Sequence, residues 1–102
     1  MSKLRKFKGG AVRDLEGDKI DYHGFYSPEV MERFGQYMHG HRQTAEGLRS
    51  SSNWKKGIDQ ESYIKSLIRH TVDFWKEPSE ELACAILFNA QGWLFEELKK
   101  KK

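Results

Sequence analysis

The sequence has little cysteine and proline, and it has no apolar run of membrane-spanning length. Its single thiol, Cys84, excludes an internal disulfide and favours a reducing compartment. Because Cys84 stands in an apolar run, a small buried hydrophobic residue is its simplest interpretation. The basic start also lacks the apolar stretch of a secretory signal. We therefore expect a soluble, cytoplasmic protein with no membrane partner.

Motifs that identify common enzyme classes are also missing. The sequence has no glycine-rich phosphate loop with its lysine, no Gly-x-Ser-x-Gly elbow and no zinc-finger spacing. Its 18 basic and 15 acidic side chains give a net charge of +3, but much of the positive charge lies in residues 3–8 and 99–102. The remaining sequence is net acidic and shows no basic stripe, so it does not favour a nucleic-acid partner.

At 102 residues the chain has the size of one domain. Glycines and charged residues without a sustained period predict an extended arm at 1–26. Apolar periodicity predicts a helical core at 27–98, and a lysine tail follows at 99–102. Because a domain of this size buries only a modest share of its surface, we expect a second copy to complete the core, through dimerisation or tetramerisation.

Helix-start and helix-stop residues predict three helices, or four if the first one breaks. The first begins with Ser27 as its cap and bends or stops near Gly40. Asp59 is expected to cap the second helix, which ends before Pro78, and Ser79 is expected to cap the third. The short turn at Pro78 makes the last two helices an antiparallel hairpin, so the fold class is all-α.

Each predicted helix carries an apolar stripe that should face the core. The stripes are Val30, Phe34, Tyr37, Met38, His41, Ala45 and Leu48 on the first helix; Ile64, Leu67, Ile68, Thr71 and Trp75 on the second; and Leu82, Ile86, Asn89, Trp93 and Leu94 on the third. The amide of Asn89 lies within its stripe, and a buried amide needs a partner. That partner is either a group on a neighbouring helix or a ligand.

Acidic residues gather where the second helix ends and the third begins. His70, Asp73 and Glu77 fall within one arc of the second helix, and Glu80 and Glu81 open the third. Crowded carboxylates repel one another, and a divalent cation that prefers oxygen ligands relieves the repulsion. One histidine without a thiolate cluster argues against zinc, so Mg²⁺ or Mn²⁺ is the expected ion.

Structural roles would also account for these residues. His70 would then be a core-edge histidine bonded to a backbone carbonyl, and Asp73 and Glu77 would be solvated. Glu80 and Glu81 would favour the positive end of the third helix without any metal.

The loop Asn53-Trp54-Lys55-Lys56-Gly57 combines an amide, an aromatic ring and two cations. Such a set can stack on a base and neutralise phosphates. The simpler alternative is a tryptophan that fills a core, with two solvated lysines beside it.

Five segments occur in a familiar order. They are Gly10-Ala-Val-Arg13-Asp14, Tyr26-Ser-Pro-Glu-Val-Met-Glu-Arg-Phe-Gly35, Asn53-Trp54-Lys-Lys-Gly57-Ile, Ser66-Leu-Ile-Arg69-His70 and Glu80-Glu-Leu-Ala-Cys-Ala-Ile-Leu-Phe-Asn89-Ala. Together they resemble the dATP/dGTP diphosphohydrolase N-terminal domain family, which is common in bacteriophages and belongs to the MazG-like all-α nucleotide pyrophosphohydrolases. The resemblance covers nearly the whole sequence.

The resemblance implies a MazG-like helical bundle that assembles as a dimer or a dimer of dimers. It implies that acidic residues on paired helices hold Mg²⁺ or Mn²⁺. The implied reaction is hydrolysis of a purine deoxynucleoside triphosphate, dATP or dGTP, to the monophosphate and pyrophosphate. A phage-encoded protein of this kind would act in the cytoplasm of a bacterial host.

The resemblance also suggests roles for individual residues. The metal ligands would be His70, Asp73, Glu77 and Glu81, and the group that orients or deprotonates the attacking water would be Glu77, Glu80 or Glu81. Phosphates would contact Arg13, Lys55, Lys56 and Arg69, while Asn53, Trp54 and Asn89 would make the other substrate contacts. Cys84 stands where the wider superfamily has an aspartate ligand. The alternative function is therefore a module that binds or sequesters a nucleotide without hydrolysing it.

Overall fold

The computed structural model describes residues 4–6, 8–10, 12–14 and 19–101. The chain divides into two compact units, Met1–Val30 and Met31–Lys102. The described residues are mostly helical, with two short antiparallel strand pairs that the sequence did not predict. The described part of the chain is mainly helical, which confirms the predicted all-α class at that level.

The first unit contains a strand pair and a short helix where the sequence predicted an extended arm. β1 (Leu4–Lys6) pairs antiparallel with β2 (Val12–Asp14). Helix α1 (Tyr22–Phe25) is capped by Asp21, whose side chain accepts a hydrogen bond from the Gly24 N–H at 3.0 Å.

Helix α2 (Pro28–Gly40) begins as the sequence predicted and ends at the glycine that was expected to weaken it. The Ser27 hydroxyl accepts a hydrogen bond from the Val30 N–H at 3.2 Å, which caps the first turn. The predicted stripe of this helix extends too far, because three of its members lie beyond the helix end. They are His41, Ala45 and Leu48.

Residues 41–52, which we call the strap, connect α2 to the rest of the second unit. Within the strap β3 (Gln43–Thr44) pairs antiparallel with β4 (Gly47–Leu48). The turn between them needs a glycine, because Gly47 has a φ of 117° in the left-handed region. The Thr44 hydroxyl donates to the Gly47 carbonyl at 2.7 Å and holds the turn closed.

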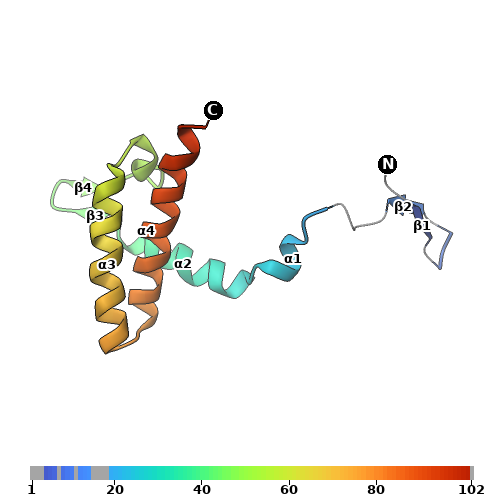
Figure 1. Cartoon of the computed structure of the whole chain (residues 1–102), viewed down its shortest axis with the longest axis horizontal. Coiled ribbons are helices and arrows are strands. Elements are labelled where there is room, and N and C mark those ends of the chain that lie inside the picture. Colours follow the sequence, from blue (N-terminus) through green and yellow to red (C-terminus); the bar gives the residue numbers. More distant parts are fainter. Residues whose placement is uncertain (1–3, 7, 11, 15–18, 102) are drawn as a thin grey trace. The chain divides into compact units, whose positions relative to one another are not determined.

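The 3₁₀ helix η2 (Asn53–Lys56) leads into a hairpin of two long helices. α3 (Gln60–Lys76) and α4 (Glu80–Lys99) pack side by side and run antiparallel (Figure 1). The predicted turn at Pro78 is confirmed, since neither helix includes that residue. This hairpin contains the buried core of the described residues.

The residues that were predicted to cap α3 and α4 occupy the N-cap positions of these helices. The Ser79 hydroxyl accepts a hydrogen bond from the Leu82 N–H at 3.1 Å, as a helix cap should. Asp59 occupies the N-cap position of α3, but its side chain makes no capping hydrogen bond.

The inward face of α3 is rotated from its predicted stripe, whereas the stripe of α4 is confirmed in part, because Asn89 is buried as predicted. On α3 the buried residue is Tyr63, whereas Ile64, Ile68 and Trp75 are exposed. α3 carries two apolar stripes, and periodicity alone does not say which one meets α4. On α4 the buried residues are Cys84, Ala85, Asn89 and Gly92, so Cys84 is the small buried residue that the sequence predicted. Trp93 and Leu94 of the predicted α4 stripe are exposed.

Contact between Tyr63 and Gly92 sets the distance between the two helices. Tyr63 is 2 % exposed, and its ring fills the space that a side chain at position 92 would need. The ring also lies edge-on to Phe88, with centroids 5.9 Å apart. Burial, with Glu96 nearby, raises the pKa of the Tyr63 hydroxyl, which has no hydrogen-bond partner among the described residues.

Residues at the C-terminal end of α4 hold the start of α3 in place. The Gln60 amide donates to the Trp93 carbonyl and to Glu97 Oε1, each at 3.2 Å. The Glu96 carboxylate accepts a hydrogen bond from the Ile58 N–H at 3.3 Å. The hydrogen bond from Gln60, with smaller contributions from Lys100 and Lys101, lowers the pKa of the Glu97 carboxyl.

Gly92→Ala should destabilise the protein by about 3 kcal/mol or more, because the added methyl group overlaps the Tyr63 ring. Gly35→Ala is the matched control. No atom lies within 4 Å of a methyl group at position 35, so this change should stabilise α2 by about 0.5–1 kcal/mol. Urea unfolding followed by circular dichroism would measure both. Equal effects of the two substitutions would contradict the close contact.

Glu97→Gln should destabilise the protein near neutral pH and have little effect in acid. A carboxyl whose folded pKa is lowered contributes stability above its unfolded pKa, and this contribution is lost as the pH falls through the folded pKa. Thermal melts of both proteins across the acid range would test this. The gap in melting temperature should close on acidification, and a gap that widens would contradict the lowered pKa.

Candidate functional site

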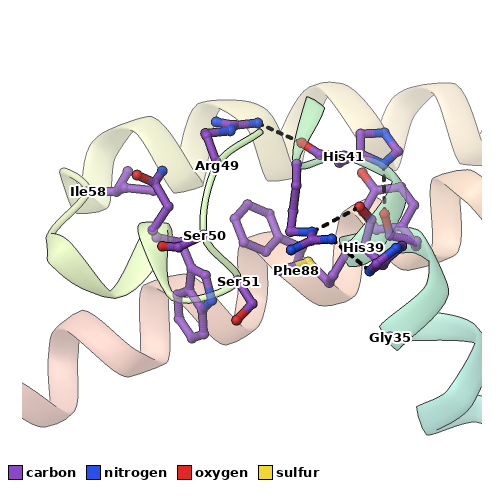
Figure 2. Close-up of a pocket in the computed structure, with 13 residues that line it drawn as sticks. Gly35, His39, His41, Arg49, Ser50, Ser51, Ile58 and Phe88 are labelled. Atoms are coloured by element: carbon purple, nitrogen blue, oxygen red, sulfur yellow. Dashed lines mark hydrogen bonds between the residues drawn. The ribbon is translucent and has the colours of Figure 1, made fainter. Parts of the chain in front are cut away.

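A cavity of about 430 Å³ lies between the end of α2, the strap and α4 (Figure 2). We call it the strap pocket. Its lining residues are Gly35, Tyr37, Met38, His39, His41, Arg42, Arg49, Ser50, Ser51, Asn53, Trp54, Ile58 and Phe88.

Hydrogen bonds from Arg49 close the strap on itself, and Arg42 joins it to His39 near the end of α2. The Arg49 N–H donates to the Arg42 carbonyl at 2.8 Å, and Arg49 Nη2 donates to the His41 carbonyl at 2.7 Å. Arg42 Nη2 lies 3.2 Å from His39 Nδ1 and donates to it when the imidazole is neutral. Arg42 and Arg49 of the strap therefore line the same cavity.

The apolar part of the pocket wall rests on an aromatic cluster. Trp54 packs edge-on against Phe88 and Phe95, with ring centroids 6.1 and 4.9 Å apart. Lys99 lies over the Phe95 ring at 4.8 Å and donates to the Lys55 carbonyl at 3.4 Å. These contacts favour the simpler alternative for Trp54, in which the ring fills the core beneath its loop.

The charges on the pocket wall are of one sign. No lining residue is an aspartate or glutamate. Among the described residues, neither Arg42 nor Arg49 pairs with a carboxylate. Two guanidinium groups without acidic partners attract an anionic ligand. A phosphate or carboxylate is therefore the group that this wall is suited to bind.

A second cavity, of about 370 Å³, contains the acidic residues at the start of α4. Glu80 forms an ion pair with Arg33, and Glu81 Oε1 lies 3.8 Å from His41 Nε2. Tyr37 and His41 line both cavities, with ring centroids 4.1 Å apart. Burial raises the pKa of the Tyr37 hydroxyl, and the nearby Glu81 and Cys84 raise it further.

The predicted metal ligands do not converge in one chain. Among the described residues, no group of three histidine, cysteine, aspartate or glutamate side chains is placed to hold a metal ion. Asp73 and Glu77 are exposed near the end of α3, Glu80 pairs with Arg33, and Glu81 lies beside the His41 imidazole. The donor set of a single copy therefore does not fit the Mg²⁺ or Mn²⁺ site that the resemblance implies.

His70 is half-buried at the edge of the core, as its structural interpretation predicted. Its Nδ1 atom is buried and has no hydrogen-bond partner among the described residues. The expected bond to a backbone carbonyl is therefore not formed at this atom. His70 also does not belong to a metal-ligand group in the part of the chain that the structure describes.

The predicted substrate residues are only partly brought together. Asn53 and Trp54 line the strap pocket, whereas Lys55, Lys56 and Arg69 do not. Lys55 and Lys56 are exposed on η2, and Arg69 donates to the Ser66 hydroxyl on α3 at 3.1 Å. Asn89 is buried and donates to the carbonyl of Ala85 in its own helix at 2.7 Å, rather than to a neighbouring helix. The side chain of Arg13 lies outside the described part of the chain.

Sequence reasoning missed the basic wall of the strap pocket. His39, Arg42 and Arg49 were not selected, and His41 was assigned only to an apolar stripe. A signal was present, because basic residues recur through the segment 39–49 just before Asn53. Their convergence depends on the fold of the strap, which the sequence did not predict.

Comparison with protein-family models, curated proteins and solved structures found no match to this chain. The described helices include none that is both long enough and apolar enough to cross a membrane.

Proposed function

We propose that this protein binds a purine deoxynucleotide in the strap pocket. One observation carries the proposal: Arg42 and Arg49 reach the same cavity and have no acidic partner among the described residues. A guanidinium group offers several N–H donors in a planar fork that matches a phosphate. A phosphorylated ligand would therefore gain charge-assisted hydrogen bonds at this wall.

The remainder of the pocket suits a nucleoside. Tyr37, Trp54 and Phe88 supply aromatic surface, and the Asn53 amide and the strap serines supply polar groups. A flat heterocyclic base can pack on such surface and form hydrogen bonds at its edge. The preference for a purine rests on the resemblance to the dATP/dGTP diphosphohydrolase N-terminal domain family.

Hydrolysis of dATP or dGTP to the monophosphate and pyrophosphate is the second candidate function. The observation that favours it is the position of Glu80 and Glu81, which line a cavity that shares Tyr37 and His41 with the strap pocket. A metal-dependent reaction would need further ligands beyond those that one described chain brings together. A second copy of the chain is the source that we propose.

Self-association is proposed because apolar side chains remain uncovered on the hairpin. Ile64, Ile68, Val72 and Trp75 form one exposed stripe along α3. Trp75 is 84 % exposed, which is unusual for so large an apolar side chain. A contiguous apolar surface of this kind is typical of an interface between proteins.

Arg42→Gln should weaken binding of dGTP or dATP by about tenfold or more, because a charge-assisted hydrogen bond contributes roughly 1.5–3 kcal/mol. Arg69→Gln removes the same charge from α3, outside the pocket, and should change affinity by less than about twofold. Isothermal titration would measure both, with circular dichroism as the check on folding. Equal losses in the two variants would contradict the proposed site, and so would the absence of nucleotide binding in the unmodified protein.

Glu81→Gln should abolish pyrophosphate release while nucleotide binding and folding persist. The assay measures pyrophosphate from each deoxynucleoside triphosphate with Mg²⁺ or Mn²⁺. Tight binding without product in the unmodified protein would exclude hydrolysis and leave binding as the function. Turnover that is unchanged in the variant would remove Glu81 from the catalytic residues.

Ile68→Asp should convert an assembled protein to monomers, because a charge buried in an apolar interface without a partner is strongly unfavourable. Ser62→Asp is the control, since Ser62 is exposed on α3 but lies away from the apolar stripe. Light scattering coupled to gel filtration would give the mass of each protein. A monomeric unmodified protein, or an assembled Ile68→Asp variant, would contradict self-association through this face.

A further inference from the structure

We propose that the strap pocket recognises a nucleoside monophosphate directly, without a divalent cation. This inference rests on the proposed nucleotide-binding function and specifies the class of ligand. In this proposal Arg42 and Arg49 neutralise the charge of the phosphate group that is attached to the sugar.

The donor chemistry of the wall favours a bare phosphate over a metal complex. The polar groups are two guanidinium groups, two imidazoles, three hydroxyls, one amide and one indole N–H, and none is a carboxylate. Mg²⁺ in proteins usually binds through one or two carboxylates together with phosphate oxygens. A metal ion would find no carboxylate here, and it would reduce the negative charge that attracts Arg42 and Arg49.

The arginines keep donors for a ligand after they hold the strap. Among the described residues, Arg49 makes one side-chain hydrogen bond, from Nη2 to the His41 carbonyl. The side chain of Arg42 contacts only the carbonyl and Nδ1 of His39. Because a guanidinium group has five N–H donors, each arginine retains several for phosphate oxygens. Two positive charges also balance the double negative charge of one terminal phosphate group.

The size and surroundings of the pocket favour a ligand with a single phosphate. Its volume of about 430 Å³ lies toward the low end of the range for small-molecule sites. Beyond Tyr37 and His41 the neighbouring cavity presents Glu81 together with the Arg33–Glu80 ion pair, so its lining has more negative than positive charge. Further phosphates that extend in this direction without a metal ion would meet like charges. A monophosphate avoids this repulsion.

Titration in excess EDTA with dGMP, dGTP and deoxyguanosine would test the inference. We expect dGMP to bind at least about tenfold more tightly than either of the others, with little change when EDTA is replaced by Mg²⁺. Arg42→Gln should weaken dGMP binding by about tenfold and leave deoxyguanosine binding unchanged. An equal loss for both ligands would indicate a structural effect and would contradict a phosphate contact.

Two results separate failure of this inference from failure of the proposed function. Nucleotide binding that requires Mg²⁺ or Mn²⁺, or that favours dGTP over dGMP in EDTA, would overturn the inference and leave nucleotide binding in place. The absence of binding by any nucleotide, with or without metal, would overturn both.

Discussion

The close approach of α3 to α4 at Tyr63 and Gly92 is the contact on which the second unit depends. A glycine at this position allows a large ring to lie directly against the α4 backbone. The ring in turn contacts Phe88, which belongs to the wall of the strap pocket. Any change that separates the two helices would therefore also move the apolar wall of the strap pocket.

The strap supplies the other half of the pocket and depends on different forces. Its turn is closed by Thr44 and Gly47, its two ends are joined by hydrogen bonds from Arg49, and Arg42 donates to the His39 carbonyl at the end of α2. These bonds are polar and mostly exposed, so each contributes modest free energy. The pocket thus combines one wall fixed by core packing with a second wall fixed by surface hydrogen bonds. The second wall is the part that local opening would affect first.

Local rules in the sequence predicted the helix boundaries more accurately than the inward faces. Ser27, Ser79 and Pro78 act within one turn of the backbone, so their effects can be inferred without knowing the tertiary structure. The face of α3 that meets α4 depends instead on which side chain fits opposite Gly92. Two apolar stripes satisfy the helical period equally, and only the packed structure distinguishes Tyr63 from Ile64.

The candidate site was harder to predict for the same reason. Asn53 and Trp54 were selected from a local motif and do line the pocket, whereas Arg42 and Arg49 become neighbours only through the strand pair between them. The acidic residues present the opposite case. His70, Asp73 and Glu77 are close along one helix, but the described structure does not bring three ligands of this kind to one point.

The ring pair of Tyr37 and His41 keeps two oppositely charged compartments apart. His41 Nδ1 donates to the Tyr37 carbonyl at 2.8 Å, so the imidazole cannot turn over without losing that bond. Its other nitrogen faces Glu81, while the same residue lines the basic cavity. The same two rings therefore form part of the wall of a cavity lined by Arg42 and Arg49 and of one lined by Glu81 and the Arg33–Glu80 ion pair.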